Sequence, residues 1–291
     1  MMPLIAAEFF KLRKRMMSWV LGLILVALVV LLYTVLWNTS SRVNHFGDNN
    51  IYTGLDLRQA LFLPGAVPYG LQVVGSFGAI LAMIIAAGSI GSEYAWGTVR
   101  LMATVSSGRM RLIAAKLIVV FGLTAAGTLL AIAAALTYSF IISLYYREAS
   151  ASFLTTAFVR DQFAAYGRTL LVLLPYVTLA FAVAVIGRST LAGVGTGMGV
   201  AFAEPIINGL LGAAGSPWAN IPHYLLNTNR QIILLQNNVP AVLPRLGGGG
   251  GGGDSPVHSA LVAGLILATY SVAFVSIALV MYRRRDIGSS Q

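Results

Sequence analysis

The sequence predicts an all-α integral membrane protein with six transmembrane helices and an interfacial amphipathic helix at its N-terminus. Three observations lead to this fold class: 57% of the 291 residues are apolar, only 10% are charged, and the mean hydropathy is +0.81. Soluble domains are about 45–50% apolar and about 25% charged, so a core of ordinary size would not hide this much apolar surface from water. The composition therefore excludes an ordinary cytosolic enzyme and a disordered chain. Because the chain has no Cys, it also excludes a disulfide-stapled domain.

Residues 2–15 are predicted to form the interfacial helix. Apolar side chains recur there at the spacing of one helical face, at Ile5, Phe9, Leu12 and Met16. The other face carries Glu8, Lys11 and Arg15. A basic amphipathic helix beside a span is typical of the cytoplasmic membrane interface. Two interpretations remain open, a working interfacial element and a topology anchor with no further role.

Six segments are long and apolar enough to span a membrane. A hydrocarbon core of about 30 Å requires about 20 mostly apolar residues in a helix. The predicted spans are residues 17–37, 71–91, 112–144, 169–187, 191–211 and 259–281. They form a single transmembrane domain over residues 1–291, with no nucleotide-binding domain. An even number of spans places both termini on the same side of the membrane.

The distribution of Lys and Arg indicates which side that is. Twelve of the 19 basic residues flank the side of the termini, with only three acids beside them: Lys11, Arg13, Lys14, Arg15, Arg100, Arg109, Arg111, Lys116, Arg188, Arg283, Arg284 and Arg285. Cytoplasmic loops carry the excess of positive charge, so both termini are predicted to be cytoplasmic and the protein to lie in the plasma (inner) membrane. The net charge of +10 is therefore interpreted as a topology signal, and a nucleic-acid partner is not expected.

The outer side is predicted to have three loops, over residues 38–70, 145–168 and 212–258. In the last, residues 220–235 are consistent with short interfacial or re-entrant helices. The glycine run at residues 247–253 is followed by Asp-Ser-Pro rather than by Lys and Ser or Thr, so a flexible linker is favoured over a phosphate-binding loop. The three His residues are scattered, and no nucleophile–base pair or metal-ligand spacing occurs. We therefore expect no catalytic and no metal site on this chain.

The segment between the second and third spans is the most informative part of the sequence. A short helix lying across the membrane surface is predicted from Glu93 to Met102, with Glu93 and Arg100 facing water or a partner. The plainer alternative is an ordinary charged turn between two spans.

The fifth span holds a carboxylate and a stripe of glycines. Glu204 is the ionisable residue well inside a predicted span, which makes it a functional candidate. Pro205 permits a kink beside it. Two interpretations of Glu204 remain open: contact with a polar or cationic substrate group, or a structural carboxylate that caps a helix break or bonds Asn208. The glycines at 193, 195, 197 and 199 favour close helix packing, within the subunit or across a dimer, with a flexible gate as the alternative.

The segment between spans two and three resembles the membrane subunits of ABC-2 type transporters. Their pattern runs from Glu through Gly-Thr, a basic-apolar pair and a small-residue turn to Arg and then Lys at the start of the third span. The matching residues are Glu93, Gly97, Thr98, Arg100, Leu101, Arg109 and Lys116. Many members have Pro in the turn where this chain has Ser106-Ser107-Gly108. The N-terminal segment, Glu204-Pro205, Ile221-Pro222 and residues 282–286 also look similar.

This resemblance implies a permease that exports a hydrophobic or amphipathic substrate such as a lipid, a peptide, an antibiotic or another toxic compound. The seven matching residues would couple it to a separate cytoplasmic ABC ATPase, which would bind ATP and Mg, so that no cofactor binds this chain. Two such subunits would pair, as a homodimer or with a similar permease, in contact with membrane lipids. Glu204, Pro205 and Asn208 would then lie in or near the translocation pathway, because the second and fifth helices line it in this family.

Two alternatives come from other functional classes. A stand-alone secondary transporter or channel would use Glu204 as a proton or cation site. An intramembrane enzyme or structural anchor has no catalytic residues in the spans to support it.

Overall fold

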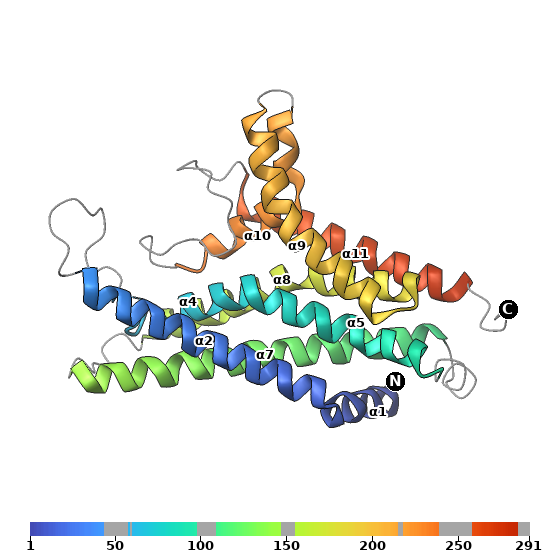
Figure 1. Ribbon diagram of the computed structural model, residues 1–291, viewed down its shortest axis with the longest axis horizontal. Coiled ribbons are helices and arrows are strands. Elements are labelled where there is room, and N and C mark those ends of the chain that lie inside the picture. Colours follow the sequence, from blue (N-terminus) through green and yellow to red (C-terminus); the bar gives the residue numbers. More distant parts are fainter. Residues whose placement is uncertain are drawn as a thin grey trace.

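The computed structural model describes residues 1–43, 58, 60–97, 109–146, 155–214, 218–238 and 258–284, and every regular element in these ranges is a helix (Figure 1). In chain order the elements are α1 (Met2–Lys14), α2 (Met16–Val43), α4 (Ala66–Val73), η1 (Val74–Gly78), α5 (Ala79–Ala95), α7 (Arg109–Tyr146), α8 (Thr156–Gly187), α9 (Thr190–Ala213), η2 (Trp218–Tyr224), α10 (Leu226–Leu235) and α11 (Ala260–Arg284).

Six helical stretches are long and apolar enough to cross a membrane. They are Met16–Ser41, Ala66–Ala95, Met110–Tyr146, Thr156–Gly187, Thr190–Ala213 and Ala260–Arg283. Each contains one predicted span almost entirely, so the predicted fold class is confirmed: the chain is an all-α, multi-pass membrane protein. The N-terminal helix α1 and the C-terminal end of α11 lie at the same end of the bundle (Figure 1).

Some helices continue beyond the apolar segments that the sequence predicted as spans. The loop expected over residues 145–168 is helical from Thr156 onward, because α8 begins there. The hydroxyl of Thr155 accepts a hydrogen bond from the backbone N–H of Phe158 (3.2 Å) and caps this start. The expected loop was wrong over this stretch because hydropathy detects only the part of a helix that suits hydrocarbon. Charged residues such as Arg160 and Asp161 lower the hydropathy without ending the helix.

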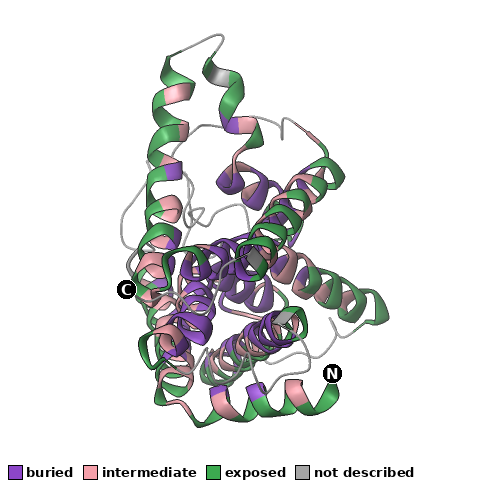
Figure 2. Ribbon diagram, turned by 90° about the vertical axis from the view of Figure 1, so that its right-hand side faces the viewer, coloured by how far each residue is buried: buried purple, intermediate pink, exposed green. Residues whose placement is uncertain are grey.

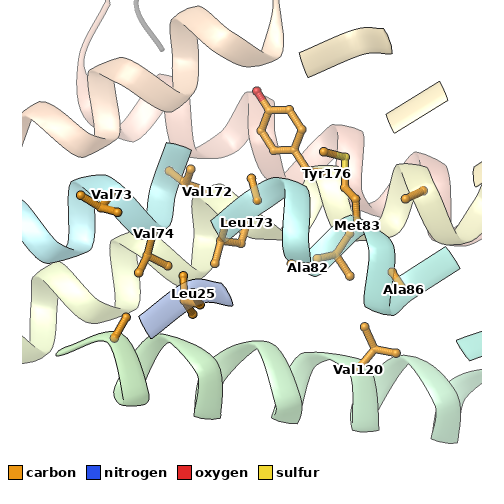
Figure 3. Close-up of a cluster of buried hydrophobic side chains, with 14 of the residues drawn as sticks. Leu25, Val73, Val74, Ala82, Met83, Ala86, Val120, Val172, Leu173 and Tyr176 are labelled. Atoms are coloured by element: carbon orange, nitrogen blue, oxygen red, sulfur yellow. The ribbon is translucent and has the colours of Figure 1, made fainter. Parts of the chain in front are cut away.

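Helices α5 and α8 form the centre of the bundle. In the apolar stretch of the second span, which ends with α5, 72% of residues are buried, and in that of α8 67%, against 17% for both α9 and α11. Figure 2 shows this arrangement, with buried residues gathered in the middle helices and exposed ones on the outer helices. Hydrophobic side chains fill the core in the middle of α5, α7 and α8, at residues such as Met83, Val120 and Leu173 (Figure 3).

Glycines bring α9 close to this central pair. A Cβ atom on Gly193 would lie 2.5 Å from a carbonyl oxygen of α8, and one on Gly197 would lie 2.6 Å from the sulfur of Met83 in α5. Packing within the subunit is thus confirmed for these two glycines. The alternate glycines face the other way, since a Cβ on Gly195 or Gly199 would meet no atom within 4 Å.

Helix α9 bends along its length, and its C-terminal half projects away from the bundle (Figure 1). The internal Pro205 removes one backbone hydrogen bond, which gives a physical reason for the bend. The chain then returns through the 3₁₀ helix η2 and enters α10, which packs against α8 and α11. The short helices expected within residues 220–235 are therefore present. The glycine run at 247–253 lies outside the described residues.

Candidate functional site

A group of four charged residues, three of them buried, joins α1, α5 and α7 at one end of the bundle. Lys116 lies at its centre, with Nζ 2.7 Å from Oε2 of Glu8 and 2.6 Å from Oε1 of Glu93. Lys11 Nζ lies 2.7 Å from Oε1 of Glu8 and 3.4 Å from Oε1 of Glu93. Glu8, Glu93 and Lys116 are each no more than 3% exposed. We call these four residues the charge cluster, and because it holds two anions and two cations its formal charges balance.

The charge cluster forms because the charged face of α1, together with Leu12 of its apolar face, packs against the protein. Glu8 and Leu12 are the buried residues of α1, whereas Phe9 and Phe10 are 46% and 58% exposed. Lipid solvates the exposed apolar side chains of a helix at the membrane interface, so their exposure carries little cost. The charged side chains of α1 gain oppositely charged partners from α5 and α7. An amphipathic helix was predicted over residues 2–15 and is present. Its charged face contacts protein.

Arg15, at the break between α1 and α2, makes a second set of contacts with α5. The guanidinium of Arg15 donates to the carbonyl oxygen of Gly88 (3.1 Å) and to Oγ of Ser92 (2.8 Å), both in α5. The same group lies 5.0 Å from the ring centroid of Trp96, within the range of a cation–π interaction. The N-terminal helix is thus attached to the last two turns of α5 by both Lys11 and Arg15.

Glu8 is held in its charged form by this environment. Burial by itself raises the pKa of the Glu8 carboxyl, but Lys116 and Lys11 both favour the ionised form and outweigh the burial, so the pKa lies below its ordinary value. Glu8 is therefore an anion at neutral pH, matched to the adjacent ammonium groups.

The structure brings together two of the seven residues predicted to couple to an ATPase, namely Glu93 and Lys116. Gly97 has φ 68°, a left-handed conformation that favours glycine, directly after Trp96, the C-cap residue of α5. Arg109 is the first residue of α7. The remaining predicted residues lie outside the described part of the chain: Thr98, Arg100 and Leu101.

The prediction that Glu93 faces water or a partner was wrong. We expected it to begin a surface helix running to Met102 and to face water or a partner. Instead it lies in the last turn of α5, is 2% exposed, and contacts Lys116 and Lys11. The physical reason is that a carboxylate at the end of a span gains more from two ammonium groups of the same chain than from the interface.

Glu8 and Lys11 are the members of the charge cluster that were not predicted as site residues, and Glu8 is the buried one of the two. Its partner Lys116 is 108 residues away, so no local spacing links the two. One signal was available, because Glu8 is the single acid in a segment with four cations between residues 11 and 15. An isolated acid in a basic helix that adjoins a span indicates an ion pair.

A second buried carboxylate, Glu204, lies on α9 at the N-terminus of α10. Its side chain interacts with the backbone N–H groups of Leu226 and Asn227. The N-cap residue of α10, Leu225, offers no side-chain cap, so the carboxylate of Glu204 takes that role from the neighbouring helix. Among the described residues, Arg230 of α10 is the charged group that acts on Glu204, but no ion pair within 4 Å joins Glu204 to any of these residues.

Asn208, which lies one turn after Glu204 on α9, connects α9 to α10. The Nδ2 atom of Asn208 donates to Oγ1 of Thr228 in α10 (3.2 Å). The predicted bond from Glu204 to Asn208 is therefore not the one that forms. The carboxylate caps a helix, as one interpretation held, but that helix is α10 rather than a break within α9. Arg230 donates to Oδ1 of Asn227 (2.6 Å), which keeps its head group beside this boundary.

Glu204 also lines a cavity of about 410 Å³ between α8, α9, η2, α10 and α11. The rest of the lining is apolar or aromatic, and includes Leu179, Gly199, Tyr270 and Phe274. A larger cavity of about 680 Å³ lies between α1, α2, η1, α5, α7 and α8, but no buried charged side chain lines it. We take the smaller cavity as the candidate binding site because a buried carboxylate supplies specificity that apolar walls alone do not.

Within the described ranges, no group of three or more His, Asp or Glu side chains is arranged to hold a metal ion. Two of the three histidines do meet, since Nε2 of His258 lies 2.9 Å from the carbonyl oxygen of His223.

The candidate functional site thus has the two parts described above: the charge cluster at one end of the bundle, and the cavity beside Glu204.

Comparison with known proteins identifies a family but assigns no activity. A family model described as a protein of unknown function (DUF2705) matches residues 28–288. The searches of curated proteins and of solved structures gave no match. Because the family model covers most of the chain and five of the six spans in full, this protein belongs to the DUF2705 family.

Proposed function

We propose that this chain is the membrane-spanning permease subunit of an ABC-2 type transporter, exporting a hydrophobic or amphipathic substrate with ATP hydrolysed by a separate partner. The observation that carries the proposal is the charge cluster. Two residues of the transporter-like segment, Glu93 and Lys116, contact each other and the N-terminal interfacial helix through Glu8 and Lys11.

This arrangement supports a role in transmitting force. Residues 97–109 connect the end of α5 to the start of α7, and the charge cluster fixes those two ends to each other and to α1. A partner that pushed on the connecting segment would therefore move three helices as one unit. Because α5 packs along α8 and α9, the motion would reach the helices that surround the Glu204 cavity.

The partners and the membrane topology are proposed on the same basis. The ATPase subunit binds residues 97–109 from the cytoplasm and carries ATP and Mg, while a second copy of this chain or a similar permease completes the pathway. Both termini are then cytoplasmic and the protein lies in the plasma membrane, in agreement with the excess of Lys and Arg at the end of the termini. The chain itself performs no catalysis.

The test is co-expression with a tagged ABC ATPase encoded beside the gene, followed by purification through that tag. We expect the chain to co-purify and to raise ATP hydrolysis by the ATPase in lipid nanodiscs. Arg100→Glu reverses a charge in the connecting segment and should reduce both readouts. The matched control is Arg160→Glu, because its side chain is 79% exposed near the start of α8, at the opposite end of the bundle. Equal loss in both variants, or no co-purification with such an ATPase, would reject the proposal.

A second candidate function is a stand-alone secondary transporter or channel. The observation that favours it is Glu204, a buried carboxylate with no ion pair to any described residue. Transport by the purified chain alone in liposomes, driven by an ion gradient, would decide for this candidate.

A further inference from the structure

The cavity beside Glu204 combines one buried anionic group with apolar and aromatic walls. Glu204 is 6% exposed and one of its oxygens, Oε2, is buried without a hydrogen-bond partner. The backbone N–H groups at the start of α10 interact with this carboxylate, yet Oε2 remains unsatisfied. A buried acceptor without a partner is costly, so a ligand that donates to it or brings a positive charge is bound favourably.

Two aromatic residues of the lining suit a positive charge as well. Tyr270 and Phe274 of α11 line the cavity, and their ring centroids lie 5.9 Å apart. Faces of aromatic rings attract ammonium groups, and a cage of such rings is a known way to hold a quaternary ammonium. The hydroxyl of Tyr270 donates to the carbonyl oxygen of Tyr224 (3.3 Å), which orients the ring.

The size and chemistry of the lining exclude other ligand classes. An anion would be repelled by Glu204, and a metal cation needs several oxygen ligands where this lining offers one carboxylate among apolar walls. A proton needs no cavity of about 410 Å³, a volume in the range of pockets for organic ligands.

We propose that this cavity binds an organic cation, a positively charged centre carried on an apolar body, with Glu204 as its counter-ion. The apolar part contacts side chains such as Leu179 and Leu226, and the charged centre lies between Glu204 and the rings of Tyr270 and Phe274. That such a cation is the exported cargo rests on the proposed function. Binding itself requires no ATPase.

The test measures binding of radiolabelled tetraphenylphosphonium to the purified full chain in lipid nanodiscs. Tetraphenylborate, which has the same shape and the opposite charge, is the control ligand, and empty nanodiscs give the background from lipid. We expect saturable binding of the cation and none of the anion. Equal saturable binding of both ions would overturn the proposal, because the site would then select shape and not charge.

Substitutions of residues that line the cavity test whether the cation binds there. Glu204→Gln removes the counter-ion and should weaken binding at least about tenfold, equivalent to about 1.4 kcal/mol. Because this variant also changes the cap of α10, Gly199→Leu supplies an independent test. Gly199 lines the cavity and faces open space, so a Leu side chain fits there and occupies the volume.

Gly195→Leu is the matched control, since Gly195 also faces open space one turn earlier on α9 but does not line the cavity. We expect loss of binding in Gly199→Leu and unchanged binding in Gly195→Leu, with equal thermal unfolding temperatures. Unchanged binding in Gly199→Leu would overturn the proposal. Failure of co-purification with an ATPase would reject the proposed function and leave this binding result standing, so the two failures are distinguishable.

Discussion

The two buried carboxylate sites of this protein differ in how their charge is compensated. In the charge cluster, Glu8 and Glu93 contact two ammonium groups at distances of 2.6–3.4 Å. At the boundary of α9 and α10, Glu204 interacts with backbone N–H groups and has no ion pair with any described residue. A buried charge therefore stabilises the fold when the fold supplies its partners, and is available to a ligand when the fold does not.

The helices that carry the two sites show the same difference. Glu93 lies on α5 in the centre of the bundle, whereas Glu204 lies on α9, which is mostly exposed and packs closely on one face only. The charge cluster is thus enclosed by three helices, while the Glu204 site adjoins a cavity.

The largest effect that tests this contrast is expected from Lys116→Met. The substitution leaves Glu8 and Glu93 buried beside each other with Lys11 as the remaining cation, and loss of one partner from a buried ion pair costs about 3–5 kcal/mol. Thermal unfolding followed by tryptophan fluorescence measures the loss. Lys14→Met, at an exposed lysine of α1, is the control and should cost less than about 1 kcal/mol. Similar losses in the two variants would show that the charge cluster does not stabilise the fold.

A smaller and more direct comparison uses the same substitution at both sites. Glu93→Gln weakens a charged hydrogen bond to Lys116 and should lower the free energy of unfolding by about 1.5–3 kcal/mol. Glu204→Gln removes no ion pair and keeps an oxygen that faces the start of α10, so the expected loss is about 0.3–1 kcal/mol. If Glu204→Gln proved the more destabilising variant, the distinction between a structural and an available carboxylate would not hold.

The smallest effect concerns pH. Because the pKa of Glu8 is lowered in the folded state, its ionised form contributes stability above the ordinary value of 4.5, and this contribution is lost as the pH falls through the lowered pKa. Unfolding temperatures measured from neutral pH down to acid pH should therefore fall more steeply in the wild type than in Glu8→Gln. Parallel curves for the two proteins would argue against Glu8 as an anion held by Lys116.

The fold class was predictable from the sequence because hydrocarbon imposes a length and a composition on each span. The start of α8 was not, because Arg160 and Asp161 reduce hydropathy in a segment whose backbone hydrogen bonds continue unchanged. Hydropathy thus locates the part of a helix that lies in lipid and not the ends of the helix.

The two sites were predictable to different degrees. Glu204 was recognisable from the sequence because a lone ionisable residue inside a span is costly wherever it points. Its role at the start of α10 depends on a tertiary contact with Leu226 and Asn227, which no periodicity reveals. Likewise Glu93 and Lys116 were selected, but their burial depends on Glu8, whose link to Lys116 spans 108 residues.

That separation in sequence has a consequence for how the protein is made. Glu8 leaves the ribosome 108 residues before Lys116, which at about 5–20 residues per second is a delay of roughly 5–20 s. During this interval α1 is at the membrane without its final partner, and α2 and α5 are inserted first. The arrival of a single lysine at the start of α7 then joins the first helix made to the third span and completes the charge cluster, before α8, α9 and α11 have been made.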